Sequence, residues 1–593
     1  MKNLNKNQVI QPKKQTLYYK SVKGIYWSER DIDLDNVESL VNQFDIEYLN
    51  AKVLTGRGIN VRNFNNFLNS KIKNNLPNPS NLFDLDMSTE LIVEFILNKR
   101  KIGILGDYDV DGATSTALLC SYLKKINAPY EYYIPDRVKE GYGPNKGAFQ
   151  KLMEKGCKLV LTVDCGTTAN ISIEEATNNG IKIVVVDHHQ QGGKLPENCF
   201  IINPNRNKDK SDLNNLAAVG VSFLLLVSIH RKLKEKKIFK KTQEPNLLDF
   251  LDLVALGTIC DVVKLDTLNR AFVKQGLKII NQTKNLGLRS LIDSSGIKNE
   301  IDEYHLGYVL GPKINAGGRI GDSSKGVELL LSDNPEHTLL ISDELTQLNI
   351  ERQKIEKKVE NLAITKINKE DNIICVNGKD WHPGVIGIVA GRLTERFLKP
   401  SIVISESLEI CKGSARSIPG YNIGELINKA FEDGILENGG GHKMAGGLSI
   451  KKEKISLFKS FLKSKSSVIK LQNKKYYDHE ITLSLVNKSL FNLVNNISPF
   501  GSGNPKPKFL IKKCFVKFPK LVGNNHLSFY LSDIYGNSIK AISFKAFDNP
   551  IGNILMESRG KILNLIGQVT MNNWNNTETL QLQIEDVCEE LVN

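Results

Sequence analysis

Three short apolar segments of the chain each end in side chains that commonly bind metal ions. Apolar runs that alternate with helical segments are typical of a parallel sheet covered on both faces. Such sheets bind ligands at the carboxyl ends of their strands, so the three endings should meet at one edge. Together with Asp261, they contain enough carboxylates and imidazoles to hold two divalent cations. The endings are Gly106-Asp107-Tyr108-Asp109-Val110-Asp111-Gly112, Thr162-Val163-Asp164-Cys165-Gly166 and Val186-Asp187-His188-His189.

The set of ligands favours a hard cation. Carboxylate oxygens with one or two imidazoles suit Mg²⁺ or Mn²⁺ better than zinc, which usually takes more histidine or cysteine. Mn²⁺ is the first choice because an imidazole ligand is less typical of Mg²⁺. Two such ions about 3.5–4 Å apart can activate water and stabilise the leaving oxygen of a phosphodiester. The sequence therefore predicts two divalent cations, Mn²⁺ or alternatively Mg²⁺, as cofactors of a hydrolytic site.

Each element also has a simpler interpretation. The Asp-x-Asp-x-Asp-Gly stretch resembles a calcium loop, but Leu118 stands where an EF-hand has its glutamate. An isolated aspartate after a strand, such as Asp164, is usually a helix cap or a turn former. The adjacent His188 and His189 could be a surface pair. The metal interpretation depends on all of them following apolar strands of one sheet.

Composition narrows the class of protein only moderately. The chain has 593 residues, enough for several domains, and a formal net charge of +14. This charge favours an anionic partner such as nucleic acid, although an excess of Lys and Asn can make a chain basic without one. Nine cysteines without C-x-x-C spacing argue against a disulfide framework or a zinc ribbon. We find no signal peptide or membrane-spanning stretch, which favours a cytoplasmic protein with no membrane partner.

The pattern along the chain predicts five parts and an α/β fold class. Residues 1–98 should form helices and loops that pack on the catalytic domain, residues 99–334. A long polar helix, residues 335–370, should connect it to a second α/β domain, residues 371–465. Residues 475–593 contain about five short strands of alternating polarity, which suggests a barrel of the OB type.

The sequence also predicts the elements around the aspartates and the aromatic side chains that the barrel could use. The first apolar run predicts a strand over residues 102–105, then a loop across the aspartates, then a helix over residues 114–127. An OB barrel would hold a single strand by stacking bases on aromatic side chains, about half of which must instead lie in the core. The candidates are Phe515, Phe518, Phe529, Tyr530, Phe544 and Trp574.

These segments resemble the motifs of the DHH phosphoesterase superfamily. The similarity to its RecJ branch, the single-strand-specific exonucleases, covers nearly the whole chain. Residues 99–334 then resemble the DHH domain and residues 371–465 the DHH-associated (DHHA1) domain. The resemblance extends through Pro135-Asp136-Arg137, Gly141-Tyr142-Gly143, Asn203-Pro204-Asn205, Gly311 to Arg319, Trp381 to Gly387, Gly413 to Ser417, and Pro499 to Pro505.

The resemblance implies a role for each candidate site residue. Asp164 would bridge the two ions, His189 would contact the scissile phosphate or support the ligands, and Asp187 would orient an imidazole; we count His189 and Asp187 as catalytic residues. The implied metal ligands are Asp107, Asp109, Asp111, Asp164, His188 and Asp261. The implied substrate-binding residues are Arg137, Asn315, Arg319, Ser414, Arg416, Gly440, Gly441 and His442.

By the same resemblance, the chain would be a metal-dependent 5′-to-3′ exonuclease. It would hydrolyse phosphodiester bonds of single-stranded DNA with a two-metal-activated water, in recombination and repair. The implied partners are single-stranded DNA, a helicase and a single-strand-binding protein, and the chain is expected to be a monomer.

Two alternatives remain open. A DHH phosphodiesterase could act on short oligoribonucleotides or cyclic dinucleotides, although such a substrate needs no barrel. The chain could instead be a non-catalytic DNA-binding scaffold with a decayed site. The presence of all six expected metal ligands counts against decay.

Overall fold

The computed structural model describes residues 18–137, 139–240, 243–407, 409–465, 474–574 and 577–590. These residues form two compact units. The terminal unit contains the described parts of residues 1–69, 471–498 and 505–593. The central unit contains those of residues 70–470 together with the short segment Pro499–Asn504. Each unit is described by itself below.

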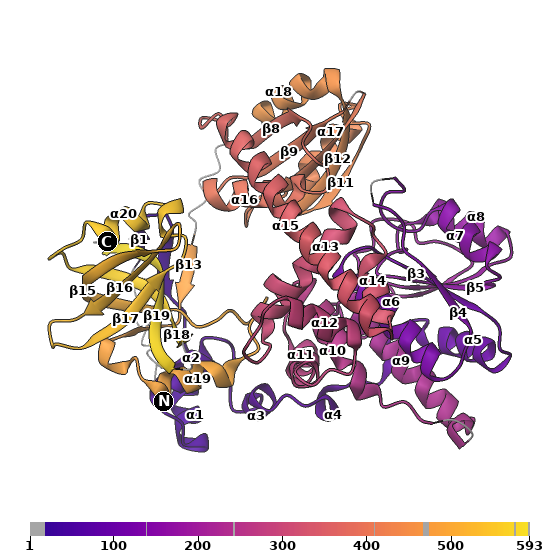
Figure 1. The fold of residues 1–593 in the computed structure, drawn as a ribbon, viewed down its shortest axis with the longest axis horizontal. Coiled ribbons are helices and arrows are strands. Elements are labelled where there is room, and N and C mark those ends of the chain that lie inside the picture. The colour runs from indigo at the N-terminus through magenta and orange to yellow at the C-terminus, as the bar shows by residue number, and fades with distance from the viewer. Residues whose placement is uncertain are drawn as a thin grey trace, which may run out of the picture. The chain divides into compact units, whose positions relative to one another are not determined.

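The central unit is built on a parallel sheet of five strands in the order β4-β3-β5-β6-β7. Strands β3, β4 and β5 are labelled in Figure 1. From β3 the chain moves outward to β4 and then returns across β3 to β5. The strand order therefore reverses between β3 and β5, which is the place where open α/β sheets bind ligands. The strands are β3 Ile102–Gly106, β4 Tyr130–Tyr133, β5 Leu159–Val163, β6 Lys182–Val186 and β7 Phe200–Ile202.

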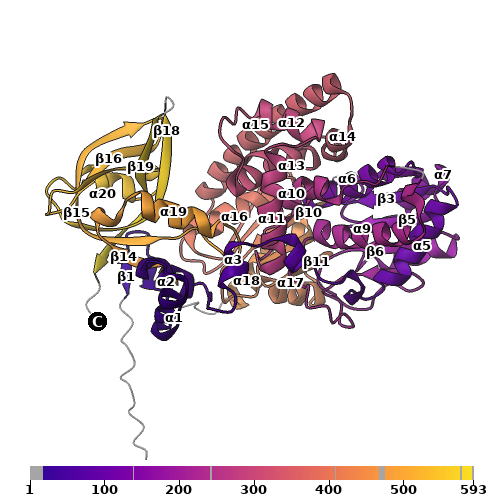
Figure 2. The same cartoon turned by 90° about the horizontal axis from the view of Figure 1, so that it is seen from below.

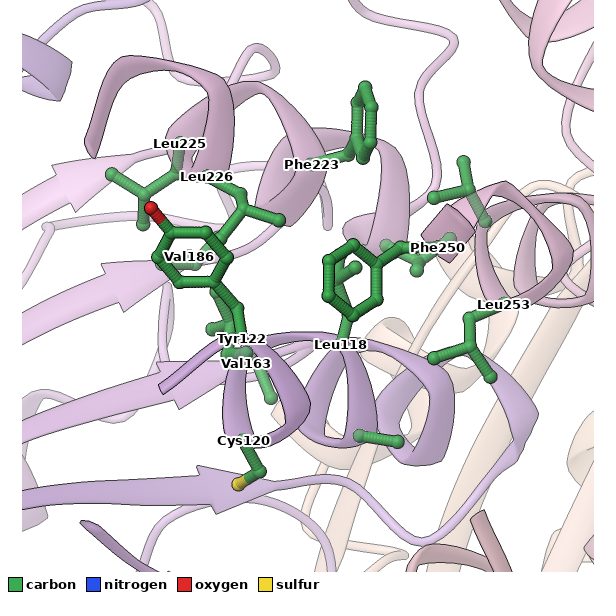
Figure 3. Packing of buried hydrophobic residues seen from close by; sticks show 14 of the residues in the cluster. Leu118, Cys120, Tyr122, Val163, Val186, Phe223, Leu225, Leu226, Phe250 and Leu253 are labelled. Atoms are coloured by element: carbon green, nitrogen blue, oxygen red, sulfur yellow. The ribbon is translucent and has the colours of Figure 1, made fainter. Parts of the chain in front are cut away.

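Helices cover both faces of this sheet, as the apolar runs predict. On β6, Ile183 and Val185 pack towards α7 and α8, whereas Val184 and Val186 pack towards α5, α6 and α9. Figure 3 shows the second of these cores, where Tyr122 of α6 lies among side chains of α9 and neighbouring elements. The helices are α5 Leu85–Leu97, α6 Val110–Lys125, α7 Lys146–Glu154, α8 Asn170–Asn178 and α9 Ala218–Glu235.

The aspartate-rich loop is shorter than we expected, because it covers only residues 107–109 before α6 begins. Helix α6 begins at Val110 because Asp109 caps it, accepting a hydrogen bond from the Gly112 amide at 3.1 Å. A Cβ atom at Gly112 would lie 2.4 Å from the carbonyl oxygen of Asp107, so only glycine lets the helix begin this close to β3. The first helical turn thereby carries Asp111 towards the end of the sheet.

A helical layer follows the sheet and leads into the expected long helix. That helix, α15, runs from Pro335 to Thr365 after an Asn334 cap. The preceding helices are α10 Leu251–Cys260, α11 Thr267–Ile280, α12 Leu286–Ser294, α13 Gly311–Ile320 and α14 Lys325–Leu331. Short elements lie at α4 Ile72–Asn75, η1 Pro79–Asn81, η2 Ile238–Lys240, η3 Leu247–Phe250 and the π-helix η4 His305–Leu310.

A second, mixed sheet follows α15 in the order β11-β12-β10-β9-β8. Only β8 and β9 are parallel, and the glycine-rich stretch forms the antiparallel pair of β11 and β12. The strands are β8 Ile374–Lys379, β9 Ser401–Glu406, β10 Ile410–Arg416, β11 Asn438–His442 and β12 Ala445–Lys451. The helices are α16 Ile386–Phe397, α17 Ile423–Glu432 and α18 Ile455–Lys465, with η5 at Lys452–Lys454.

The terminal unit contains a closed barrel of five strands (Figure 2). Its pairing runs from β15 through β16, β17, β19 and β18 back to β15, which confirms the expected OB-like fold. The strands are β15 Phe509–Val522, β16 His526–Ser532, β17 Ser538–Ser543, β18 Leu563–Trp574 and β19 Thr577–Glu590. The other elements here are β13 Lys474–Tyr477, β14 His479–Ile481, η6 Leu483–Leu485, α19 Lys488–Ile497, η7 Ala546–Asp548 and α20 Ile551–Met556.

The N-terminal part of the chain does not all pack where we expected. Strand β1 (Tyr19–Ser21) pairs with β19, and β2 (Tyr26–Glu29) pairs with β1, so both extend the sheet of the barrel. Trp27 is fully buried there, and its indole N–H donates to Asp586 at 2.9 Å. Helices α1 Leu34–Phe44, α2 Tyr48–Thr55 and α3 Phe64–Leu68 belong to the same unit. Only the part after residue 69 joins the central unit, where α5 contributes to the core. Strands of three and four residues are too short for a periodic pattern to reveal.

No helix among the described residues has both the length and the apolar character needed to cross a membrane.

We predict that Asp252 makes the stability of the central unit depend on pH. Burial raises the pKa of this carboxyl to about 6, although hydrogen bonds from Thr283 and Leu253 lower it. In the unfolded chain the value is about 3.9, so between about pH 4 and 6 the folded chain binds more protons. The free energy of unfolding should therefore fall as pH rises through this window, by about 2–3 kcal/mol for this group. Urea denaturation at several pH values measures it.

Two variants test the assignment to Asp252. Asp252→Asn should remove this part of the slope. Thr283→Val, which deletes the hydroxyl that donates to the carboxylate at 2.6 Å, should extend the falling limb to higher pH. An unchanged slope in Asp252→Asn would assign the pH dependence to other groups.

Candidate metal centre

Three of the expected site segments lie side by side at the carboxyl edge of the parallel sheet. Gly106, Val163 and Val186 are aligned as neighbours across β3, β5 and β6. The backbone ladder continues one residue further, since the Asp107 amide donates to Val163 and the Asp164 amide donates to Val186. The register of the sheet therefore brings Asp107, Asp164 and Asp187 to the same level, as the sequence predicts.

The ligand atoms of the candidate residues form three overlapping groups. Within each group the atoms lie within 4.8 Å of one another. His188 is central, because its Nε2 lies 3.3 Å from Asp164 Oδ1 and 3.6 Å from Asp261 Oδ2. Asp164 also belongs to two of the groups. The groups are Asp107, Asp109 and Asp164; Asp111, His188 and Asp261; and Asp164, His188 and His189.

The residues fit divalent cations. Asp164 is 2% exposed, and its Oδ1 has no hydrogen-bond partner among the described residues. A buried carboxylate oxygen without a donor is costly, and a bound cation would compensate for the lost hydration. Asp164 also has φ +61°, in the left-handed region, which often indicates a functional constraint.

The electrostatics of the site also favour the binding of cations. Burial and then repulsion from Asp109 raise the pKa of Asp111 to about 7. Burial and then the charges of Asp111 and Asp109 raise the pKa of Asp261 to about 9. The pKa values of Asp107 and Asp164 also lie well above the ordinary range, first because of burial and then because of neighbouring carboxylates. Positive charge among these groups would offset their repulsion.

Asp111 is held by hydrogen bonds from the N-terminus of α9. Its two carboxylate oxygens accept hydrogen bonds from the amides of Ala218 and Val219, at 2.6 and 2.9 Å. These amides are at the N-terminus of α9, where backbone N–H groups have no partner within the helix. A carboxylate has further lone pairs, so this anchoring orients Asp111 and still permits metal binding.

The two adjacent histidines have opposite electrostatic character. Burial and then the charge of His189 lower the pKa of His188 to about 4, so its imidazole is neutral and can act as a ligand. Burial alone would lower the pKa of His189, but the hydrogen bond and charge of Asp187 raise it to about 9. His189 Nδ1 lies 2.8 Å from Asp187 Oδ1. His189 is therefore cationic at neutral pH.

Asp187 belongs to none of the three ligand groups. It accepts hydrogen bonds from the amides of Thr167, His188 and His189. Burial would raise the pKa of Asp187, but its bonds to His189 and its other donors hold it below the ordinary range. The geometry fits a residue that orients His189.

A cavity of about 200 Å³ joins part of the metal cluster to two arginines. Two tyrosines that the sequence analysis did not select also line it. Tyr142 donates to the carbonyl oxygen of Asp164 at 3.1 Å, and the Arg137 guanidinium lies 5.0 Å from the centre of the Tyr108 ring. Their positions next to Asp107 and between Gly141 and Gly143 were the only available signals. The lining residues are Asp107, Tyr108, Asp109, Arg137, Tyr142, His189, Asn315 and Arg319.

The charge of Arg137 acts on two other arginines, Arg319 and Arg416. Burial and then the charges of Arg137 and Arg352 lower the pKa of Arg319 to about 10. Burial and then Arg137 lower the pKa of Arg416. In the part of the chain that the structure describes, Arg137, Arg319 and Arg416 form no ion pair with a carboxylate. Ser414 Oγ lies 3.4 Å from Arg416. Such a group of cations favours binding of an anion such as phosphate.

The remaining candidates do not line this cavity. Gly440, Gly441 and His442 lie on β11, the edge strand of the second sheet. Gly440 has open space where a side chain would be, and all three residues are exposed. The glycine run therefore forms an exposed edge strand.

Family models match three parts of the chain. The model for the N-terminal domain of the DHH family matches residues 101–258, the DHHA1 domain model residues 362–467, and the RecJ OB domain model residues 477–586. The parallel sheet therefore lies in a domain of the DHH family. The ligand candidate Asp261 lies just beyond the first match.

Individual relatives identify the branch. The single-stranded-DNA-specific exonuclease RecJ of Bacillus subtilis (strain 168) is 33% identical over 576 residues, which is 95% of this chain and 70% of the relative. The crystal structure of RecJ in complex with Mn²⁺ from Thermus thermophilus has a TM-score of 0.79 at 26% identity, covering 94% of this chain and 78% of that chain. For its complex with Mg²⁺ the TM-score is 0.74 at 25% identity, covering 94% and 77%. The chain belongs to the RecJ family of single-stranded-DNA-specific exonucleases.

We predict that Asp164→Asn abolishes metal-dependent hydrolysis and stabilises the protein in EDTA. Asn tolerates the left-handed backbone of Asp164, whereas Ala would add about 1–2 kcal/mol of strain. Removing a buried ligand should lower kcat with Mn²⁺ by at least about 100-fold. Removing one of several repelling carboxylates should raise the free energy of unfolding in EDTA by about 1–2 kcal/mol.

Asp212→Asn is the matched control, because Asp212 is exposed and has φ +58°. Asp212→Asn should change neither kcat with Mn²⁺ nor the free energy of unfolding in EDTA. Calorimetric titration with Mn²⁺ and denaturation in EDTA provide the measurements. Full activity and full Mn²⁺ affinity in Asp164→Asn would contradict the assignment.

Proposed function

We propose that this protein is a metal-dependent exonuclease that hydrolyses single-stranded DNA in the 5′-to-3′ direction, in DNA recombination and repair. The observation that carries the proposal is the shared cavity, in which Asp107 and Asp109 of the metal cluster lie with Arg137 and Arg319. A hydrolase for phosphodiesters needs both cation ligands and phosphate-binding cations. Membership of the RecJ family supports single-stranded DNA as the substrate.

The metal ligands would be the six residues of the overlapping groups other than His189. When bound, two Mn²⁺ or Mg²⁺ ions would neutralise charge on the phosphate and make water a stronger nucleophile. The T. thermophilus RecJ complexes with both metals support this choice. The ligands would be Asp107, Asp109, Asp111, Asp164, His188 and Asp261.

The protein side chains would supply the remaining chemistry. His189, held by Asp187 and cationic at neutral pH, would donate a hydrogen bond to a non-bridging phosphate oxygen. Its Nε2 lies 3.3 Å from the hydroxyl of Tyr142, on the side of the cavity. No protein side chain needs to act as a nucleophile. His189 and Asp187 therefore act as substrate-binding and positioning groups of the reaction.

The arginine cluster would select the end of the strand. A terminal phosphate carries more negative charge than an internal phosphodiester, and guanidinium groups bind two of its oxygens at once. Arg416 with Ser414, and Arg137 with Arg319, are the residues that would hold it. Binding of a 5′-phosphate there would set the direction of cleavage. Asn315 and the backbone of Gly440, Gly441 and His442 would contact the strand elsewhere.

The barrel would hold the strand by stacking. Phe518, Tyr530 and Phe544 are exposed, whereas Phe529 is buried in the barrel core. Phe518 is 80% exposed and has φ +54° at an irregularity of β15, between Lys517 and Lys520. Bulges commonly direct a side chain outward for function. Of the other candidates, Phe515 is half-buried, and the side chain of Trp574 lies outside the described residues.

We also propose a cellular setting for this activity. Because the cavity is small, a helicase would supply single strands from duplex DNA, and a single-strand-binding protein would act alongside. We further propose that the protein acts as a monomer in the cytoplasm.

The test compares single-stranded DNA, duplex DNA and RNA, labelled at either end, with Mn²⁺ present. Only single-stranded DNA should be degraded rapidly. A 5′ label should leave at once as a mononucleotide, whereas a 3′ label should remain on strands that shorten progressively. Preferential hydrolysis of short RNA would favour the oligoribonucleotide alternative, and binding without hydrolysis would favour the scaffold alternative.

Arg416→Ala tests the end-selection part of the proposal. Wild type should prefer a 5′-phosphorylated strand to one with a 5′-hydroxyl, and the variant should reduce that preference roughly tenfold through a higher KM. Arg396→Ala, at an exposed position of α16, is the control. An unchanged preference in Arg416→Ala would exclude Arg416 from binding the strand end.

A further inference from the structure

The segment Pro499–Asn504 belongs to the central unit, although the residues on both sides of it belong to the terminal unit. It lies in the chain between α19 and β15. The segment closes on itself, because Gly501 and Asn504 exchange backbone hydrogen bonds of 3.0 and 3.1 Å. The Asn504 side chain also donates to the carbonyl oxygen of Pro499 at 2.9 Å. These hydrogen bonds hold the segment as a compact turn.

This segment contacts the loop that joins α10 to α11, residues 261–266, which we call the Asp261 loop. The amide of Leu265 donates to the carbonyl oxygen of Ser502 at 2.8 Å. Just beyond the loop, the buried Arg270 donates to the carbonyl oxygen of Pro499 at 3.3 Å. Two hydrogen bonds thus attach the segment to the loop and to the first turns of α11.

Two glycines of the segment are in close contact with side chains of the Asp261 loop. A Cβ atom at Gly501 would lie 2.9 Å from Leu265 Cδ1 and 3.9 Å from Ile259 Cδ1. A Cβ atom at Gly503, which has φ +78°, would lie 2.6 Å from Lys264 Cγ. The backbone of the segment therefore lies directly on the side chains of the loop and on the end of α10.

The Asp261 loop is strained and needs such support. Val262 has φ +59°, which is a true outlier for a β-branched residue. Strained backbone persists only where its surroundings determine it more than once. Two other contacts hold the far end of the loop: Asn215 donates to the Asp266 side chain, and Asn269 donates to the carbonyl oxygen of Lys264. The segment supplies the contact between them, at Leu265.

We propose that Pro499–Asn504 is a positioning element for Asp261. By fixing Leu265 it holds the strained loop so that the Asp261 carboxylate stays at the cluster, 3.6 Å from His188 Nε2. The inference rests on the proposed function, in which Asp261 is a metal ligand. One consequence is that a chain truncated near residue 475 loses part of its metal site together with the barrel.

The test uses the full chain with Gly501→Val, Leu265→Ala and the double variant. Valine at 501 should displace the segment from Leu265, and shortening Leu265 to alanine should restore the space. Gly501→Val should weaken Mn²⁺ binding at least about tenfold by calorimetry and lower kcat, while KM for a long single strand stays within about twofold. The double variant should recover to within about threefold of Leu265→Ala alone, a rescue expected only of residues in contact.

Hydrogen exchange shows whether the loop has moved. Peptides that cover residues 261–266 should exchange faster in Gly501→Val and regain protection in the double variant. If Gly501→Val lacks a cooperative unfolding transition, Asn504→Ala replaces it. That variant removes the side-chain bond to Pro499, and the same changes in exchange and Mn²⁺ affinity are expected.

Asp261→Asn separates failure of this inference from failure of the proposed function. If Asp261→Asn binds Mn²⁺ as tightly as wild type, Asp261 is not a ligand and the metal assignment fails. If Asp261→Asn loses affinity while Gly501→Val keeps wild-type affinity despite faster exchange of the loop, the positioning role is overturned. Failure of the Leu265→Ala rescue also overturns it.

Discussion

Repulsion among the carboxylates at the edge of the central sheet is the constraint on which the rest of the site depends. Burial and mutual charge raise the pKa of Asp111 to about 7 and that of Asp261 to about 9. Groups that repel one another in this way would move apart unless the scaffold held them. Each is therefore attached to a different rigid part of the fold, and the cost of bringing them together is offset when cations bind.

The carboxylates of the site are held in place by different kinds of structure. The register of three parallel strands places Asp107 and Asp164, and the N-terminal amides of α9 hold Asp111. Asp109 is held as the cap of α6. Asp261 caps the C-terminus of α10, where its amide donates to the carbonyl oxygen of Gly257, and the strained Val262 follows it in the loop against which Pro499–Asn504 packs. The metal centre thus combines regular secondary structure with one position that needs tertiary help.

Much of the candidate site could be predicted from the sequence because its residues directly follow strands. An apolar run that ends in Asp107, and another that ends in Asp164, lead to the same edge in any parallel sheet that pairs them. The helix start was wrong for a local reason, since an aspartate cap and the close approach at Gly112 are not visible in periodicity. Tyr108 and Tyr142 were missed because only the folded chain turns them into the cavity.

The sequence by itself determined the strands, the chemistry at their ends, the long helix and the barrel, because these depend on local patterns of apolar residues. Tertiary structure alone decided three further features. Strands β1 and β2 join the barrel sheet through pairing with β19, far away in the sequence. Phe518 faces solvent whereas Phe529 is buried, which depends on a bulge and on barrel closure. Finally, Pro499–Asn504 packs on the Asp261 loop, a contact between segments more than 200 residues apart that no local pattern specifies.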